Sequence, residues 1–182
     1  MKIIDTDVSF IKEYYPHEYD QYNINEVGEH YKLLHWFSNQ FTGATLADLG
    51  TLSGISALAL GYNRKNSVIS YDINPAYPPY KNHFDNIEFR RMDINREYYK
   101  TWLSCSLILL DIDPHDGKQE KQFLSYLRAI DYKGIVICDD IKLDNMKQFW
   151  EEVVQDKMDV THLGHSTGTG IINFTGEPLC LE

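Results

Sequence analysis

Short apolar runs that alternate with helical stretches constrain the fold of this chain more than any other feature of its sequence. The runs of strand length span residues 45–49, 67–71, 87–91, 106–110 and 134–138. Stretches with helical character lie between them at residues 53–60, 95–103 and 118–130. Strands that alternate with helices form parallel sheets with helices on both faces. The pattern therefore predicts an α/β fold with a doubly wound, mostly parallel sheet.

The two ends of the chain add further elements to this sheet. A helix is predicted over residues 144–154, and two strand-like runs follow at residues 158–163 and 170–174. Their short, Gly-rich link favours an antiparallel hairpin, which brings the sheet to seven strands. Before the first strand, apolar residues at three-and-four spacing predict a helix over residues 26–41, which Gly43 ends.

Length and composition narrow the class of protein. The 182 residues fit one domain, in which residues 1–43 are expected to form N-terminal helices that act as a lid and residues 44–182 the core. A net charge of -10 without a Lys or Arg cluster argues against a nucleic-acid partner. No apolar run approaches the roughly 20 residues that cross a bilayer, and the first residues do not resemble a signal peptide. We therefore expect a cytoplasmic protein without a membrane partner; the sequence leaves its oligomeric state open.

A Gly-containing turn follows the first predicted strand. Asp48 ends that strand, and Gly50 and Gly54 lie in the turn that opens the next helix. In doubly wound sheets, ligands bind beyond the carboxyl ends of the strands. The turn alone fits either a tight structural connection or a ligand cradle. Asp72, 24 residues after Asp48 at the end of the second strand, favours the second interpretation, because a carboxylate there can accept both ribose hydroxyls. Asp93, after the third strand, is a candidate acceptor for an adenine amino group.

With this turn, the second acid and the terminal hairpin, residues 45–174 resemble the class I S-adenosylmethionine-dependent methyltransferases. The resemblance implies a Rossmann-like sheet, the methionine end of the cofactor at the Gly turn, and its ribose at Asp72. Nicotinamide-binding Rossmann domains lack the hairpin and use a Gly-x-Gly-x-x-Gly spacing, which Gly50 and Gly54 do not provide. A nicotinamide-dependent oxidoreductase is therefore a less favoured alternative.

One departure from the usual family motif narrows the resemblance. Leu52 stands where most members have a middle glycine. The metal-dependent O-methyltransferases, such as catechol O-methyltransferase, have a bulky residue there and continue with Gly-x-Ser, as Gly54-Ile55-Ser56 does here. The resemblance implies that Ser56 contacts the cofactor carboxylate.

The same subfamily binds a divalent cation with acids that follow the fourth and fifth strands. Asp111 occupies the first of these places, and Asp139 and Asp140 occupy the second. Three converging carboxylates would repel one another unless a cation joined them, and oxygen ligands suit Mg²⁺, Mn²⁺ or Ca²⁺ rather than Zn²⁺. Of these three cations, we expect Mg²⁺ at this site. Alternatively, these acids cap loop ends, and one of them, Asp111, holds the amino group of the cofactor.

The general base is less constrained than the cofactor site. His115 lies in a segment that resembles the Asp-Gly-Asp-His segment of small-molecule methyltransferases, shifted one place by Pro114. Lys142 follows the acidic pair and is a second candidate, and His165 in the hairpin link is a third. The resemblance implies metal-assisted O-methylation of a small hydroxylated or sugar-like molecule. A non-catalytic cofactor-binding subunit with the same fold remains an alternative.

Overall fold

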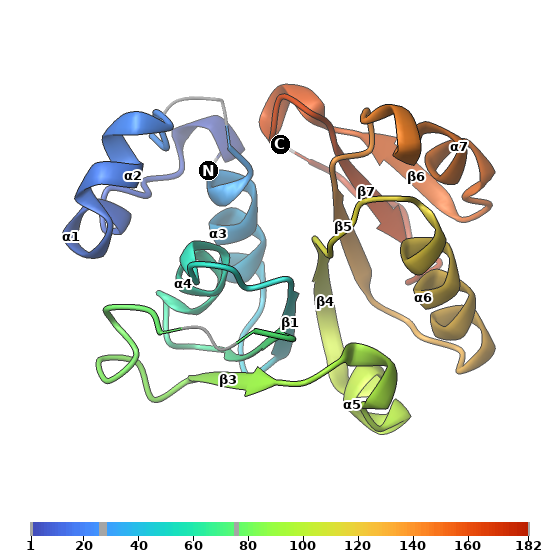
Figure 1. The fold of residues 1–182 in the computed structure, drawn as a ribbon, viewed down its shortest axis with the longest axis horizontal. Helices are drawn as coiled ribbons and strands as arrows, with labels where there is room; N and C mark the ends of the chain where they lie inside the picture. Colours follow the sequence, from blue (N-terminus) through green and yellow to red (C-terminus); the bar gives the residue numbers. More distant parts are fainter. Residues whose placement is uncertain (1, 26–28, 75–76, 182) are drawn as a thin grey trace.

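A seven-stranded mixed sheet forms the centre of the molecule (Figure 1). The structure, a computed structural model, describes residues 2–25, 29–74 and 77–181. Within these residues the strand order is β3-β2-β1-β4-β5-β7-β6, with β1 to β5 parallel and β7 antiparallel to both of its neighbours. The strands are β1 (Thr45–Leu49), β2 (Ser67–Asp72), β3 (Ile87–Arg91), β4 (Cys105–Leu110), β5 (Ile135–Asp139), β6 (Asp156–Asp159) and β7 (Thr169–Asn173). The predicted doubly wound sheet and its terminal antiparallel pair are confirmed.

Helices cover both faces of this sheet. One face carries α1 (Ile11–Tyr14), α2 (Pro16–Gln21), α3 (Tyr31–Gln40) and α4 (Ile55–Gly61), and the other carries α5 (Tyr99–Ser104), α6 (Lys118–Ala129) and α7 (Asp144–Glu152). Along β4, Leu107 and Leu109 pack in the first core, whereas Ile108 and Leu110 pack in the second. This alternation explains why the strand is apolar from Leu107 to Leu110, as expected for a central strand buried on both faces.

The N-terminal segment packs into the core on the face of α4. Ile3, at the start of a 3-10 turn (Ile3–Asp5), is buried there together with Val8, Ile11 and Ile24. No helix within the described residues is long and apolar enough to span a bilayer.

Two predicted boundaries at the ends of the chain were wrong. The helix predicted over 26–41 begins at Tyr31, because Glu29 and His30 are not helical; residues 26–28 lie outside the described part of the chain. The strand predicted over 158–163 ends at Asp159, whose carboxylate accepts hydrogen bonds from the amide (3.0 Å) and hydroxyl (2.5 Å) of Thr161. This local cap turns the chain into a 3-10 turn (Thr161–Leu163).

The helix predicted over 95–103 is also divided. A 3-10 turn (Ile94–Arg96) precedes the separate helix α5. The carboxylate of Asp93 accepts the amide of Asn95 (2.9 Å), and that of Glu97 accepts the amide of Tyr98 (2.7 Å). Asp93 therefore caps the 3-10 turn, and Glu97 binds the amide of Tyr98 between that turn and α5, where the helical run is interrupted.

Candidate active site

Gly50 lets the carboxyl ends of β1, β2 and β4 approach one another. Its amide donates to the Tyr71 carbonyl (2.9 Å), and the Asp111 amide donates to the Leu49 carbonyl (3.0 Å). Gly50 has φ +96°, and a Cβ atom there would lie 1.5 Å from the carbonyl oxygen of Asp111. Only glycine fits this position, because both the backbone conformation and the close approach exclude a side chain. The turn predicted as a ligand cradle thus also fixes the position of Asp111.

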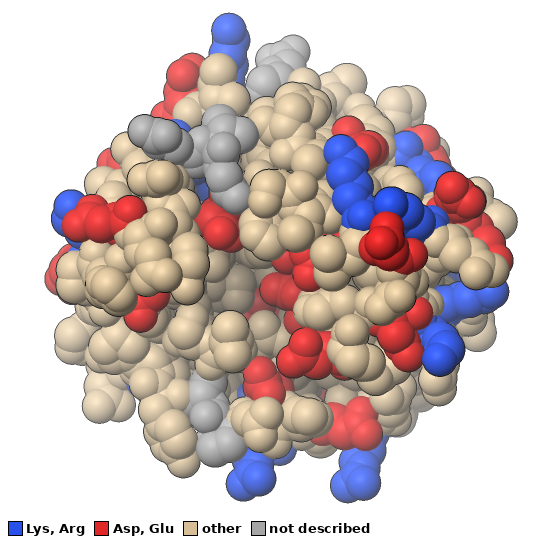
Figure 2. Space-filling view, turned by 45° about the horizontal axis from the view of Figure 1, so that its top comes forward, with Lys and Arg blue, Asp and Glu red and all other residues tan. Residues whose placement is uncertain are grey.

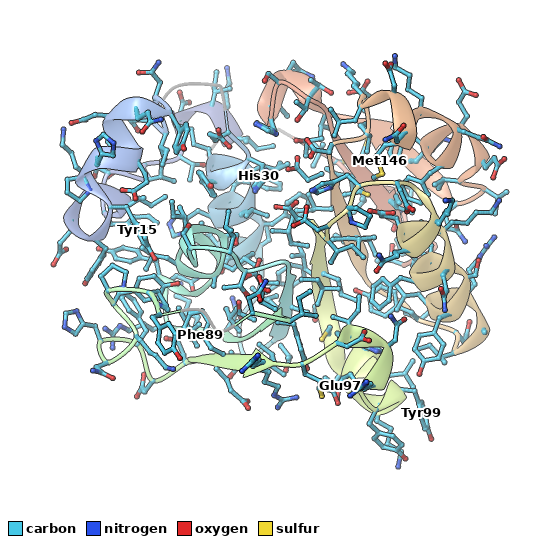
Figure 3. All side chains as sticks on the ribbon, viewed as in Figure 1. Tyr15, His30, Phe89, Glu97, Tyr99 and Met146 are labelled. Atoms are coloured by element: carbon cyan, nitrogen blue, oxygen red, sulfur yellow. The ribbon has the colours of Figure 1, made fainter. Side chains whose placement is uncertain are left out.

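Two tyrosine hydroxyls hold the turn at Gly54, directly before α4. Its φ is +93°, and a Cβ atom would lie 2.9 Å from the Tyr80 hydroxyl. That hydroxyl donates to the Gly54 carbonyl, and the Tyr15 hydroxyl donates to the Ser53 carbonyl (2.6 Å). Figure 3 shows Tyr15 beside the N-terminal helices. Tyr80 was not predicted as a site residue, since it lies in a connection without a motif.

Asp72 and Leu52 lie together at this turn. The amide of Leu52 donates to Asp72 Oδ2 (3.0 Å), and the amide of Asn74 donates to Asp72 Oδ1 (2.7 Å). Each carboxylate oxygen accepts a second hydrogen bond readily, so the two hydroxyls of a ribose fit the remaining lone pairs. The Leu52 side chain is 86% exposed and has φ +45°, so the bulky residue at the family's middle glycine points into solvent.

Asp48 is fully buried beneath the turn. Its Oδ2 accepts hydrogen bonds from the hydroxyls of Ser70 (2.7 Å) and Thr51 (3.4 Å), and the Ser56 hydroxyl also stabilises the carboxylate. Burial nevertheless raises the pKa of Asp48. Oδ1 has no hydrogen-bond partner among the described residues. A buried carboxylate oxygen without a partner is a fitting acceptor for an ammonium group of a ligand.

The third predicted cofactor acid has a local role. Asp93 Oδ1 accepts both the amide (2.9 Å) and the side-chain nitrogen (3.0 Å) of Asn95. Its contact with an adenine amino group stays a prediction.

The three predicted metal ligands meet at the carboxyl ends of β4 and β5, but histidines lie among them. Asp111, Asp139 and His30 offer ligand atoms that all lie within 4.8 Å of one another, and so do Asp139, Asp140 and His165. Asp139 is shared by both groups. Figure 2 shows Asp and Glu side chains gathered around a hollow in the middle of this face. The two groups are compact enough to hold a divalent cation.

His30 and Glu29 enter this cluster from the segment before α3, and sequence analysis missed both. His30 Nδ1 lies 3.5 Å from Asp139 Oδ1, and Glu29 Oε1 lies 3.7 Å from His165 Nε2. Figure 3 shows His30 near the start of α3, close to the central strands. No spacing links these residues to the strand ends, so only tertiary structure could reveal them.

The histidines alter the charge balance of the acids. Burial alone would lower the pKa of His30, but the negative charge of Asp139 raises it to about 9. Hydrogen bonding to Asp139 and Asp140 raises the pKa of His165 to about 10. Burial opposes ionisation of Asp139, yet the two histidines hold its pKa well below the usual value. Burial and the Asp139 charge raise the pKa of Asp111 to about 8. Imidazolium groups therefore offset part of the predicted repulsion before any cation binds.

Of the three candidate bases, His165 lies beside Asp139 and Asp140, and the other two lie in different places. His115 contacts the acidic cluster, with Nδ1 3.5 Å from Asp140 Oδ2 and Nε2 3.9 Å from Asp111 Oδ1. The ammonium group of Lys142 instead pairs with Asp159 Oδ2 (3.3 Å) at the end of β6. The structure thus brings His115 to the predicted metal ligands and directs Lys142 toward another acid.

This chain resembles known proteins in its fold, but comparison of its full sequence found no match. No protein-family model and no curated protein sequence matches the chain. Among solved structures, a methyltransferase from Podospora anserina with bound S-adenosylhomocysteine is 13% identical, with a TM-score of 0.64 over 90% of this chain and 86% of that chain. A protein from Staphylococcus aureus named as a caffeoyl-CoA O-methyltransferase is 13% identical, with a TM-score of 0.63 over 90% and 97%. An RNA methyltransferase from Salinibacter ruber, in complex with S-adenosylhomocysteine, is 16% identical, with a TM-score of 0.52 over 84% and 95%. The chain has the fold of the S-adenosylmethionine-dependent methyltransferases.

Proposed function

We propose that this chain is an S-adenosylmethionine-dependent methyltransferase. One observation carries the proposal: β7 lies antiparallel between β5 and β6, in a sheet whose first strand ends in a Gly turn. This fold is similar to those of proteins solved with S-adenosylhomocysteine. A nicotinamide-binding sheet would lack the inserted strand and would have a different Gly spacing.

The residues around the turn fit the chemical groups of this cofactor. The unpartnered Oδ1 of Asp48 suits the ammonium group of its methionine end, and Asp72 suits its ribose hydroxyls. Gly50 and Gly54 have no side chain, so a ligand could approach the backbone between these two acids. Ser56 would contact the carboxylate of the cofactor. When bound, the cofactor supplies an electrophilic methyl group. The role of the chain is to hold an acceptor in line with that group and to exclude water.

A divalent cation fits beside this position. Asp111 and Asp139 would hold it at the carboxyl ends of β4 and β5, and Asp140, the other predicted ligand, has a carboxylate oxygen within 4.8 Å of Asp139. A cation there supplies Lewis acidity that makes an acceptor hydroxyl more acidic. His115 is the candidate general base, since it contacts Asp111 and Asp140, whereas Lys142 is held by Asp159.

The acceptor is proposed to be a small hydroxylated molecule. A net charge of -10 disfavours a nucleic-acid acceptor, since such binding depends on Lys and Arg groups that neutralise phosphates. The N-terminal segment places Glu29 and His30 over the acidic cluster, which supports its proposed role as a lid. These features favour transfer to a small molecule over transfer to RNA.

Calorimetric titration of the full chain tests the cofactor assignment. S-adenosylhomocysteine is expected to bind and NADH is not. Asp72→Asn should weaken S-adenosylhomocysteine at least about tenfold, because hydrogen bonds to a charged group are worth about 1.5–3 kcal/mol. Asp85→Asn is the matched control, since that side chain is 94% exposed in the same connection. Binding of NADH but not S-adenosylhomocysteine would refute the proposal.

Methyl transfer to a panel of hydroxylated compounds and to RNA tests the chemistry. We expect transfer to a small hydroxylated compound that increases with Mg²⁺ or Mn²⁺ and falls when a chelator is added. Tight cofactor binding without transfer to any acceptor would instead indicate a non-catalytic cofactor-binding subunit. A rate of methyl transfer that changes with neither cation would contradict metal assistance.

A further inference from the structure

His30 is a buried polar side chain without a hydrogen-bond partner. Its side chain is 5% exposed, and neither Nδ1 nor Nε2 has a partner among the described residues. Among the described residues, the carboxylate oxygen nearest to the ring is Asp139 Oδ1, at 3.5 Å from Nδ1, which is long for a hydrogen bond. Buried polar groups are almost always satisfied, since desolvation without compensation costs free energy. The position of His30 therefore indicates a ligand that the chain itself does not supply.

The surroundings of His30 identify the chemistry of that ligand. Its ring, Asp111 and Asp139 come from three separate elements, namely the residue before α3, the end of β4 and the end of β5. Their ligand atoms all lie within 4.8 Å of one another. A first-row metal ion with ligands at about 2.0–2.2 Å holds adjacent ligand atoms about 3 Å apart. Small side-chain rotations would therefore close this group around one ion.

We propose that His30 is a third protein ligand of the cation, so that the site takes a first-row transition ion such as Mn²⁺ or Co²⁺ in preference to Mg²⁺ or Ca²⁺. This inference rests on the cation site of the proposed function. Imidazole nitrogen binds first-row transition ions well, whereas Mg²⁺ and Ca²⁺ are hard ions that select oxygen. Mn²⁺ accepts both kinds of donor, which suits a site with two carboxylates and one imidazole.

His165 lies nearby but has a different set of contacts. Its Nδ1 lies 2.6 Å from the Thr167 hydroxyl and 3.6 Å from Asp139 Oδ2, while its Nε2 lies 3.7 Å from Glu29. Its Nδ1 therefore already has a hydrogen-bond partner within the chain, which neither ring nitrogen of His30 has. We assign His165 to orienting the carboxylate of Asp139, a common role for polar groups behind metal ligands.

Pulsed electron paramagnetic resonance of Mn²⁺ bound to the full chain tests this assignment. A coordinated imidazole adds a ¹⁴N modulation to the Mn²⁺ signal, which oxygen ligands do not. The wild type is expected to show the modulation, and His30→Asn to lose it and to bind Mn²⁺ at least about tenfold more weakly. His165→Asn should keep the modulation. His162→Asn, at an exposed histidine of the Thr161–Leu163 turn, is the remote control.

The outcomes separate this inference from the proposed function. Modulation that is lost in His165→Asn but kept in His30→Asn would overturn the assignment of His30. Mn²⁺ bound without modulation, and no more tightly than Mg²⁺, would overturn it while leaving an oxygen-only cation site. Failure to bind any cation, with S-adenosylhomocysteine still bound, would refute the cation and keep the cofactor. If His30→Asn does not fold by circular dichroism, His30→Gln and the Mn²⁺ over Mg²⁺ preference of the wild type carry the same test.

Discussion

Replacement of Gly50 by alanine should destabilise the protein more than the same change at another positive-φ glycine. Gly50 and Gly43 have φ +96° and +72°, and each Gly→Ala change carries a backbone cost of about 1–2 kcal/mol. At Gly43 a new Cβ meets nothing within 4 Å, whereas at Gly50 it would lie 1.5 Å from the Asp111 carbonyl oxygen. Overpacking of this kind adds about 1–3 kcal/mol. Gly50→Ala should therefore cost about 2–5 kcal/mol in the free energy of unfolding.

Thermal unfolding followed by circular dichroism measures this difference. For a domain of this size, 1 kcal/mol shifts Tm by about 2–4 °C. We expect Tm to fall by about 4–20 °C for Gly50→Ala and by about 2–8 °C for Gly43→Ala, with the larger fall always at Gly50. Because the clash displaces Asp111, Gly50→Ala should also weaken cation binding. Equal Tm values for the two variants would refute the argument that Gly50 is required for the approach of β4.

Three further predictions concern the core, a charged network and the cofactor. Leu109→Ala, at a fully buried position of β4, should cost about 2–5 kcal/mol by urea unfolding, whereas Leu103→Ala, 44% exposed, should change stability by less than about 1 kcal/mol. Burial opposes ionisation of Glu97, but hydrogen bonds from the Tyr71 hydroxyl (2.6 Å) and Arg90 (2.8 Å) lower its pKa. A lowered folded-state pKa stabilises the protein above the ordinary value of 4.5 and loses this effect as pH falls below it. Glu97→Gln should therefore destabilise at pH 7 and match the wild type in acid; a gap that persists in acid would contradict this. S-adenosylhomocysteine at about 100 times its Kd should stabilise the fold by about 2.7 kcal/mol and raise Tm by about 5–11 °C in a thermal-shift assay, and an unchanged Tm would contradict binding.

Much of the fold could be predicted because hydrophobic pattern reports burial directly. The central strands β4 and β5 are apolar at nearly every position, and their bounds differ from the prediction by one residue at most at each end. Errors arose where a side chain capped the backbone locally, as Asp159 does after β6 and Asp93 does before α5. Such caps compete with regular structure and leave no periodic signal.

Only some residues of the candidate site could be predicted from the sequence. Residues that follow parallel strands meet at one end of a sheet, so Asp48, Asp72, Asp111 and Asp139 could be grouped from chain order alone. His30 could not, because its position depends on how the segment before α3 packs against the sheet. Charge repulsion among the acids was likewise overestimated, since the imidazoles that offset it come from other parts of the chain.

A crystal structure of the chain with S-adenosylhomocysteine and Mn²⁺ tests the central claim most directly. The account predicts the ribose hydroxyls within hydrogen-bond distance of both Asp72 oxygens, and the amino group of the ligand beside Asp48 Oδ1. It also predicts Mn²⁺ density between Asp111, Asp139 and His30. S-adenosylhomocysteine bound away from the Gly50–Gly54 turn, or absent from crystals soaked well above its Kd, would contradict the proposal that this turn holds a methyl-donor cofactor.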